Sequence, residues 1–322
     1  MQKKAHYQNY LITGGMGFIG AHLARALLKQ NNFCTVMVLD RVLREEKFSS
    51  LPSEARDRLC LIKGDYRNET LMKAALSKTD FIFHLAATVS VGACDEDPVE
   101  SHANNVTGLV QLLNSLKSHD QKLPLVFSSS AAVYGNSGIS PLAEADAKHG
   151  EPQSFYAAQK LASEKICRLF AINFKLPISV VRFFNVYGPE QDPRSPYSGV
   201  ISIFADRLTE RRALTIHGDG KQTRDFVHVN DIVSGLLAHT EKLNSDQEFW
   251  QANPINLASG KSVSLLELIN EMKPIFGSSA VEFGPFREGD VKKSCALITE
   301  ANRTLSYAPK VSLAEGLTSI KA

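Results

Sequence analysis

Short apolar runs alternate with longer amphipathic stretches through the first half of the chain. Apolar runs bounded by glycine or polar residues predict buried strands, and the apolar residues between them recur at the three-to-four-residue spacing of helices. The runs that predict strands are residues 10–13, 36–40, 59–63, 81–87, 125–127 and 178–185. Strands that alternate with helices in this way predict an α/β fold with a doubly wound parallel sheet.

The pattern changes after residue 187, where a proline-rich loop occupies residues 188–196. The elements predicted beyond this loop are helices at 201–211, 231–243 and 267–276 and a strand at 254–257. The sequence therefore predicts two domains. The first comprises residues 1–187 with return segments near 226–257, and the second, smaller and C-terminal, is formed mainly by residues 188–322.

Composition and charge exclude several classes of function. The 322 residues are 43% apolar, which allows a sizeable core, and 36 basic against 34 acidic residues give a net charge of +2. This balance gives no reason to expect nucleic acid or an anionic membrane as a partner. The five cysteines are scattered without metal-ligand or redox spacing, so we expect reduced thiols and no metal site. The sequence shows neither a signal-peptide pattern nor an apolar stretch of membrane-spanning length, and we expect a cytoplasmic protein.

A glycine-rich stretch joins the first predicted strand to a helical pattern. Gly14, Gly17 and Gly20 are spaced as G-x-x-G-x-x-G. In this context the first glycine permits a tight turn, the second lets the backbone approach a pyrophosphate, and the third lets helix and strand pack closely. The free N–H groups and the dipole of the following helix favour the anion. The stretch therefore predicts a Rossmann-type dinucleotide site.

Asp40 ends the second predicted strand, twenty residues after Gly20. At this position a dinucleotide-binding fold places a carboxylate on the adenosine ribose. That carboxylate would repel a 2′-phosphate, which favours NAD over NADP. The neighbouring Arg41 argues the other way, because its guanidinium could hold the phosphate.

Other strand ends carry polar or small residues where a doubly wound sheet binds its ligands. Asp65 follows the third predicted strand, Ala86 lies at the end of the fourth, and a serine run at 128–130 follows the fifth. His84 lies within the fourth strand, and we expect it to be a core histidine rather than a catalyst.

Tyr156 and Lys160 are four residues apart in a helical pattern and therefore share one helix face. A free tyrosine titrates near pH ~10, and a nearby cation lowers that pKa because it favours the phenolate. The pair is a candidate site of proton transfer.

Several stretches form a joint pattern: residues 13–20 (TGGMGFIG), 84–87 (HLAA), 128–135 (SSSAAVYG), Tyr156-x-x-x-Lys160 and 182–189 (RFFNVYGP). Together they resemble the extended short-chain dehydrogenase/reductases, and more narrowly the 4-epimerases of nucleotide sugars, UDP-hexoses or UDP-N-acetylhexosamines. Residues 218–226 and 287–290 extend the resemblance over nearly the whole chain.

The resemblance implies NAD-dependent C4 epimerisation of a UDP-sugar through a transient 4-keto intermediate. Ser130 and Tyr156 would contact the sugar 4-hydroxyl, and Tyr156 would take its proton. Lys160 would hold the nicotinamide ribose and lower the tyrosine pKa. Together with Tyr156 and Lys160, the implied cofactor-binding residues are Gly14, Gly17, Phe18, Ile19, Gly20, Asp40, Arg41, Asp65, Tyr66, Leu85, Ala86, Ala87, Asn104 and Phe184. Together with Ser130, the implied substrate-binding residues are Val89, Asn185, Gly199, Val200, Thr215, His217, Arg224, Arg287, Asp290 and Ser294.

Two departures from the family pattern bear on the substrate. Ala131 and Ala132 stand where dehydratases of this superfamily carry an acid pair, so we do not expect 4,6-dehydration. Ser294 stands where epimerases restricted to glucose and galactose carry a tyrosine, which leaves room for a 2-acetamido group. Met16, Tyr66 and Val89 are also not the commonest residues at their positions.

The sequence leaves three alternatives open. They are a UDP-glucuronate 4-epimerase, a net reductase or dehydrogenase on the same scaffold, and a non-catalytic NAD-binding protein. The intact Ser130, Tyr156 and Lys160 argue against the last of these.

The helical patterns at 106–116 and 155–174 carry more apolar side chains than one core-facing stripe needs. They predict a homodimer with a four-helix interface. The side chains predicted for it are Leu112, Leu116, Ile166, Leu169 and Phe170.

Overall fold

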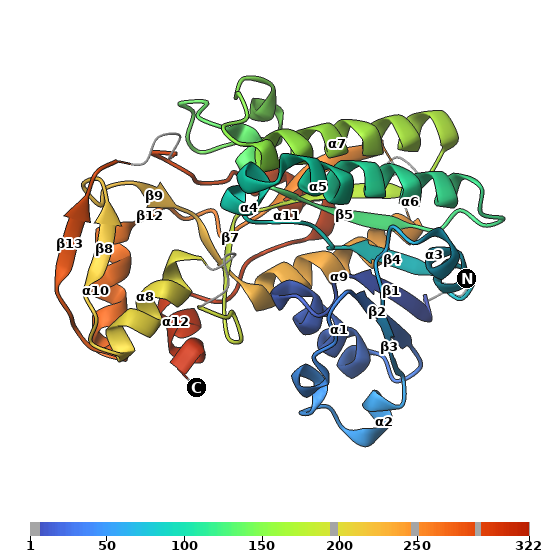
Figure 1. The fold of residues 1–322 in the computed structure, drawn as a ribbon, viewed down its shortest axis with the longest axis horizontal. Coiled ribbons are helices and arrows are strands. Elements are labelled where there is room, and N and C mark those ends of the chain that lie inside the picture. The colour runs from blue at the N-terminus through green and yellow to red at the C-terminus, as the bar shows by residue number, and fades with distance from the viewer. Residues whose placement is uncertain (1–6, 194–198, 246–250, 287–290, 322) are drawn as a thin grey trace.

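A seven-stranded parallel sheet lies at the centre of the larger part of the molecule (Figure 1). The computed structural model describes residues 7–193, 199–245, 251–286 and 291–321. The strand order is β11-β6-β5-β4-β1-β2-β3. The strands are β1 (Asn9–Thr13), β2 (Thr35–Asp40), β3 (Leu59–Lys63), β4 (Phe81–His84), β5 (Leu125–Ser130), β6 (Ile178–Phe183) and β11 (Gln251–Leu257). The order reverses between β1 and β4, which is the arrangement of a doubly wound sheet.

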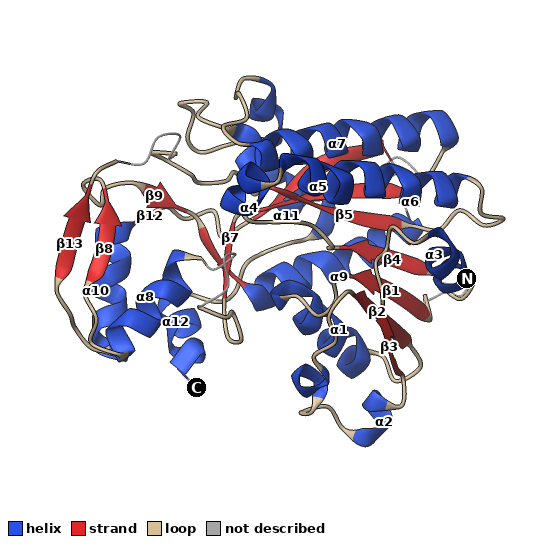
Figure 2. Ribbon diagram, in the orientation of Figure 1, coloured by secondary structure: helices blue, strands red, loops and turns tan. Residues whose placement is uncertain are grey.

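Helices cover both faces of the sheet and make three layers (Figure 2). One face is covered by α1 (Phe18–Gln30), α9 (Val229–Ser245) and α11 (Thr299–Leu305), and the other by α3 (Glu69–Leu76), α6 (Gly108–Lys117) and α7 (Phe155–Phe174). Successive strand residues point to opposite faces, so Ile12 packs in the first layer and Leu11 in the second. The predicted fold class is confirmed.

Short helices fill the connections around the sheet. They are α2 (Ser53–Arg56), α4 (Val91–Glu96), α5 (Pro98–His102), a π-helical turn (Ala103–Thr107), and 3₁₀ helices at Glu45–Phe48, Ala131–Tyr134 and Glu144–Lys148. Within the described ranges, no helix combines the length and the apolar composition needed to cross a bilayer.

A smaller lobe, beside the carboxyl ends of the sheet strands, has a core of its own (Figure 1). Its elements are α8 (Val200–Thr209), β8 (Leu214–His217), β9 (Thr223–Arg224), β12 (Val263–Ser264), α10 (Leu265–Phe276), β13 (Val281–Gly284) and α12 (Leu313–Lys321). The chain returns from this lobe to the sheet, because α9, β11 and α11 pack on or within the large sheet.

The strand predicted at 178–185 is shorter than expected, because the chain leaves the sheet at Phe184. The Phe184 N–H still bonds to the Leu257 carbonyl at 3.3 Å, but the Asn185 N–H turns to the Asp225 carbonyl at 3.0 Å. The next residues form β7 (Asn185–Tyr187), which pairs in parallel with β10 (Phe226–His228) outside the large sheet. This departure carries the chain towards the smaller lobe.

The predicted second apolar face of α6 and α7 is wrong in part. Leu112 and Leu116 on α6 are buried in the layer between α6, α7 and the sheet, so they are not available to a partner. Ile166 and Phe170 are partly buried against the same layer, whereas Leu169 is 57% exposed. The i, i+4 spacing of Leu112 and Leu116 simply adds to the core-facing stripe of the helix.

Candidate active site

The glycine-rich stretch forms the predicted tight turn between β1 and α1. Gly14 has φ = +70°, and a Cβ there would lie 2.7 Å from the amide nitrogen of Ala86, across the point where the strand order reverses. A Cβ on Gly20 would lie 2.6 Å from the Gly14 carbonyl oxygen. Gly17 is the N-cap of α1, no side chain caps it, and the first turn has no acidic residue. A helix N-terminus without a side-chain cap or an acidic residue is the arrangement that favours binding of a pyrophosphate, as predicted for Phe18 and Ile19.

Asp40 braces this turn from the end of β2. Its Oδ2 accepts the Met16 N–H at 3.1 Å and its Oδ1 accepts the Val42 N–H at 3.3 Å. A carboxylate has about four acceptor sites, so Asp40 retains capacity for the ribose hydroxyls for which it was predicted. Arg41 is exposed beside it.

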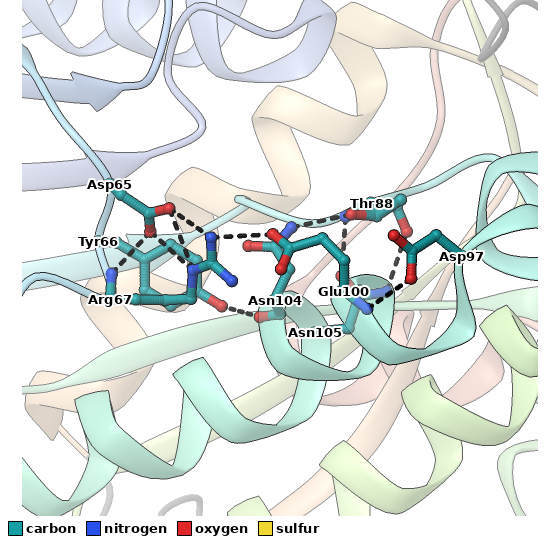
Figure 3. Close-up of polar contacts among 8 residues, drawn as sticks. All are labelled: Asp65, Tyr66, Arg67, Thr88, Asp97, Glu100, Asn104 and Asn105. Carbon is teal, nitrogen blue, oxygen red and sulfur yellow. Dashed lines mark hydrogen bonds and ion pairs between the residues drawn. The ribbon is translucent and has the colours of Figure 1, made fainter.

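Asp65 and Tyr66 follow β3 and meet the segment that leads into α6 (Figure 3). Arg67 is bidentate on Asp65, with its Nη2 2.7 Å from Oδ2, and the same guanidinium pairs with Glu100 at 2.9 Å. Burial alone would raise the pKa of Asp65, but the hydrogen bonds and charge of Arg67 outweigh it and lower that pKa. The Tyr66 hydroxyl donates to the Asn104 carbonyl. The sequence did not predict that Asp65 is engaged by a neighbour.

The π-helical turn holds the segment that follows β4 (Figure 3). Asn104 donates to the Thr88 hydroxyl at 3.0 Å, and Asn105 both accepts the Thr88 N–H at 2.7 Å and donates to the Thr88 carbonyl at 3.0 Å. Asn105 also donates to Gln159 of α7 at 2.7 Å. The segment carrying Val89 and the predicted cofactor contacts at 85–87 is thus tied to the helix of Tyr156. Sequence reasoning selected Asn104 but missed Asn105, and π turns often occur at functional sites.

Ser130, Tyr156 and Lys160 come together at the carboxyl end of β5. Ser154 caps α7 by accepting the Ala157 N–H at 3.2 Å, which fixes where the helix begins. Tyr156 and Lys160 are both buried on one face of α7, and the Ser130 side chain lies close enough to Tyr156 to influence the pKa of its phenol. The Lys160 ammonium donates to the Ser128 carbonyl at 2.7 Å and lies 5.9 Å from the centroid of the Tyr156 ring.

The predicted lowering of the tyrosine pKa is wrong for the protein on its own. Burial raises the pKa of Tyr156 to about 12, and the nearby Ser130 side chain offsets only part of this rise. Burial also lowers the pKa of Lys160 to about 8. The ammonium of Lys160 is directed at a main-chain carbonyl, so desolvation of the phenol is the stronger effect.

His84 is a core residue, as the sequence predicted. It is buried, with Nδ1 2.8 Å from the Thr13 hydroxyl and its ring edge-on to Tyr66. Burial and the charge of Lys160 lower its pKa to about 3, so the imidazole is neutral near pH 7.

Asp225 connects segments that carry predicted substrate-binding residues. The sequence did not predict this role for it. Its carbonyl accepts the Asn185 N–H at 3.0 Å, and its buried carboxylate accepts the Ala296 N–H at 3.1 Å. The segment before Ala296 carries Ser294, whose N–H bonds to the Thr223 carbonyl at 3.1 Å, next to Arg224. Asp225 lies within residues 218–226, which carry part of the family resemblance, but that pattern did not indicate its bonding partners.

The remaining predicted substrate contacts lie in the smaller lobe. Gly199 is the N-cap of α8 and Val200 its first residue, while Thr215 and His217 lie in β8. Arg287 and Asp290 lie outside the described residues.

Known proteins share this arrangement. The NAD dependent epimerase/dehydratase family matches residues 10–258. The chain belongs to this family. The UDP-glucose 4-epimerase of Mycolicibacterium smegmatis is 33% identical to it over 309 residues, which cover 95% of each chain.

Two solved structures of epimerases superpose over nearly the full length. The UDP-N-acetylglucosamine 4-epimerase of Methanobrevibacter ruminantium, in complex with UDP-N-acetylmuramic acid, has a TM-score of 0.85 and 32% identity, covering 98% of this chain and 97% of its own. The UDP-glucuronic acid 4-epimerase of Bacillus cereus, in complex with UDP-glucuronic acid and NAD, has a TM-score of 0.85 and 31% identity, covering 97% of each chain. This NAD-dependent epimerase family member is therefore similar to proteins named for three different sugars, so its own sugar must be argued from its residues.

Proposed function

We propose that this epimerase interconverts the C4 epimers of UDP-N-acetylhexosamines and also accepts the unsubstituted UDP-hexoses. The observation that carries the reaction type is the meeting of Ser130, Tyr156 and Lys160 at the carboxyl end of β5, on the same edge of the sheet as the glycine turn after β1. The observation that supports the substrate range is Ser294, a small residue whose N–H bonds to the Thr223 carbonyl, two residues before the Ala296 that Asp225 holds.

The side chains have separate roles in this proposal. Tyr156 and Ser130 contact the sugar 4-hydroxyl, and Tyr156, in its phenolate form, removes that proton at Oη and later returns it. NAD, when bound, supplies the hydride acceptor and a positive charge near the phenol. Lys160 holds the nicotinamide ribose, and the planar guanidinium of Arg224 suits the diphosphate oxygens. The 4-keto sugar turns over within the pocket between removal and return.

The test is an assay of the purified protein with UDP-N-acetylglucosamine, UDP-glucose and UDP-glucuronate in turn, without added cofactor. We expect the first two to reach a mixture of C4 epimers, resolved by chromatography, because a recycled cofactor need not be supplied. A requirement for stoichiometric NAD or NADH would indicate a net dehydrogenase or reductase. If the protein turns over UDP-glucuronate and neither of the other two sugars, the proposed substrate range is wrong and the protein is a UDP-glucuronate 4-epimerase.

We also propose a homodimer that uses the exposed residues of α5 and α7. Val99, Leu169 and Ile172 are 78%, 57% and 53% exposed, and helix faces of this kind pair in bundles. Light scattering at micromolar concentration is expected to give twice the monomer mass of 35.4 kDa. Leu169→Lys should shift the mass towards the monomer, whereas Phe33→Lys, at another exposed apolar residue, should not. A monomeric native protein would contradict this proposal.

A further inference from the structure

A buried ion pair lies behind the catalytic residues and has no part in the chemistry described so far. Glu164 and Arg182 each have a side chain that is 4% exposed, and they join at 2.7 Å between Nη2 and Oε2 and at 2.8 Å between Nε and Oε1. We propose that this pair positions Ser130 and Lys160 for proton transfer. The inference rests on the proposed function.

Glu164 connects the catalytic helix to the catalytic strand. It follows Tyr156 and Lys160 at two successive four-residue steps along α7, so the three side chains share one face. Its Oε1 accepts the Ser129 hydroxyl at 2.5 Å. Ser129 directly precedes Ser130 and lies opposite Arg182 in the β5–β6 register. The carboxylate therefore fixes α7 against the strand end that presents Ser130.

Arg182 holds the other side of the same strand end. Its Nη1 donates to the Tyr134 hydroxyl at 3.0 Å and to the Glu144 carbonyl at 2.8 Å. Tyr134 in turn donates to Asn256 at 2.6 Å and ends the 3₁₀ helix that begins immediately after Ser130. Ser130 is thus tethered before and after its own position, through Ser129 and through Tyr134.

The pair fixes geometry in a way that an apolar pair would not. A buried ion pair contributes little net stability, because replacing it with apolar residues of similar volume often leaves the stability of the fold unchanged or raises it. A bidentate arginine–carboxylate pair does, however, set both distance and angle between two elements. Misplacement of reacting groups by about 1 Å can cost ~10²-fold in rate, so this constraint bears on turnover more than on substrate binding.

The pair also acts on the charge of Lys160. The titratable groups that face Lys160 are Tyr156, Glu164 and Cys167 on its own helix, Cys94 on α4 and His84 on β4. Burial lowers the pKa of Lys160, and the negative charge of Glu164 opposes that shift. Without the charge of Glu164, the pKa of Lys160 falls further. On raising the pH, the Lys160 ammonium therefore loses its proton earlier than in the native enzyme.

The experiment compares Glu164→Gln and Ser129→Ala with the native enzyme in steady-state epimerisation. We expect Glu164→Gln to lower kcat by roughly 10–100-fold, to leave KM within about twofold, and to move the alkaline limb of the kcat profile to lower pH. Ser129→Ala keeps both charges, so it should lower kcat, leave KM unchanged and leave that limb in place. If Glu164→Gln fails to fold, Ser129→Ala still tests the inference.

The matched control is Glu300→Gln, which removes one partner of the exposed ion pair with Arg303. It should change neither kcat, KM nor the pH profile.

Hydrogen exchange of residues 128–134 gives a readout that does not depend on activity. We expect faster exchange in both test variants and native exchange in Glu300→Gln. If the native protein turns over no UDP-sugar, the proposed function fails, and exchange alone decides whether the pair holds this segment. Native kcat and pH profile in Glu164→Gln, a raised KM with native kcat in Ser129→Ala, or unchanged exchange in both would overturn the inference.

Discussion

Replacing Tyr156 with phenylalanine is expected to lower kcat for C4 epimerisation by roughly 10²–10⁴-fold, the usual size of a general acid–base contribution. The substitution removes only the hydroxyl of a buried tyrosine whose side chain lies near Ser130. Even one lost hydrogen bond would cost only about 1 kcal/mol of stability, so the fold and the binding of UDP-sugar should survive. The measurements are kcat by chromatographic assay and binding by calorimetry.

The matched control for this prediction is Tyr7→Phe. Tyr7 packs against Phe81 at the start of the first strand, far along the sheet from the strand end that holds Ser130. This variant should keep native kcat. Near-native turnover in Tyr156→Phe would remove the tyrosine from the mechanism, and loss of binding would show that the hydroxyl serves the fold instead.

Replacing Ser294 with tyrosine is expected to abolish turnover of UDP-N-acetylglucosamine and to spare UDP-galactose. The 4-keto sugar must turn within the pocket, so the wall must clear its largest substituent in both poses. Ser294 is 8% exposed and its main chain is fixed by the bond to Thr223. If Ser294 lines the sugar pocket as proposed, a phenol there would narrow it. The native enzyme should discriminate only modestly between the two sugar pairs, because a missing methylene-sized group costs ~1–3 kcal/mol.

Ser294→Ala controls for loss of the serine hydroxyl and should keep both activities. The measurement is kcat/KM for each sugar pair in the native and variant enzymes. A native enzyme that ignores acetamido sugars, or a tyrosine variant that handles both pairs as before, would show that another residue sets the pocket width.

The alternation of apolar runs and helical spacings was sufficient to predict the sheet, because buried parallel strands need continuous apolar segments. It could not show that the chain leaves the sheet at Phe184, since Phe184 continues the apolar run of β6. Leu112 and Leu116 were misassigned for a related reason: spacing marks a helix face but not what covers it.

The sequence could predict those residues of the candidate site whose role follows from their near neighbours in the chain. Examples are Gly14, in its tight turn, and Tyr156, one helical turn before Lys160. The supporting groups were not predictable, because Asn105, Glu164 and Asp225 act through partners distant in sequence. The direction of the Tyr156 pKa also depends on burial, which spacing does not report.

The return of the chain to the sheet at β11 has a consequence for biosynthesis. β6 pairs with β5 on one side and β11 on the other, but Leu257 is synthesised long after Phe183. At ~5–20 residues per second on the ribosome, the interval between the two lasts roughly 4–15 s. Throughout it, the apolar edge of β6 is an unpaired template for other nascent chains. Low temperature during expression, which slows aggregation, should therefore favour recovery of this protein.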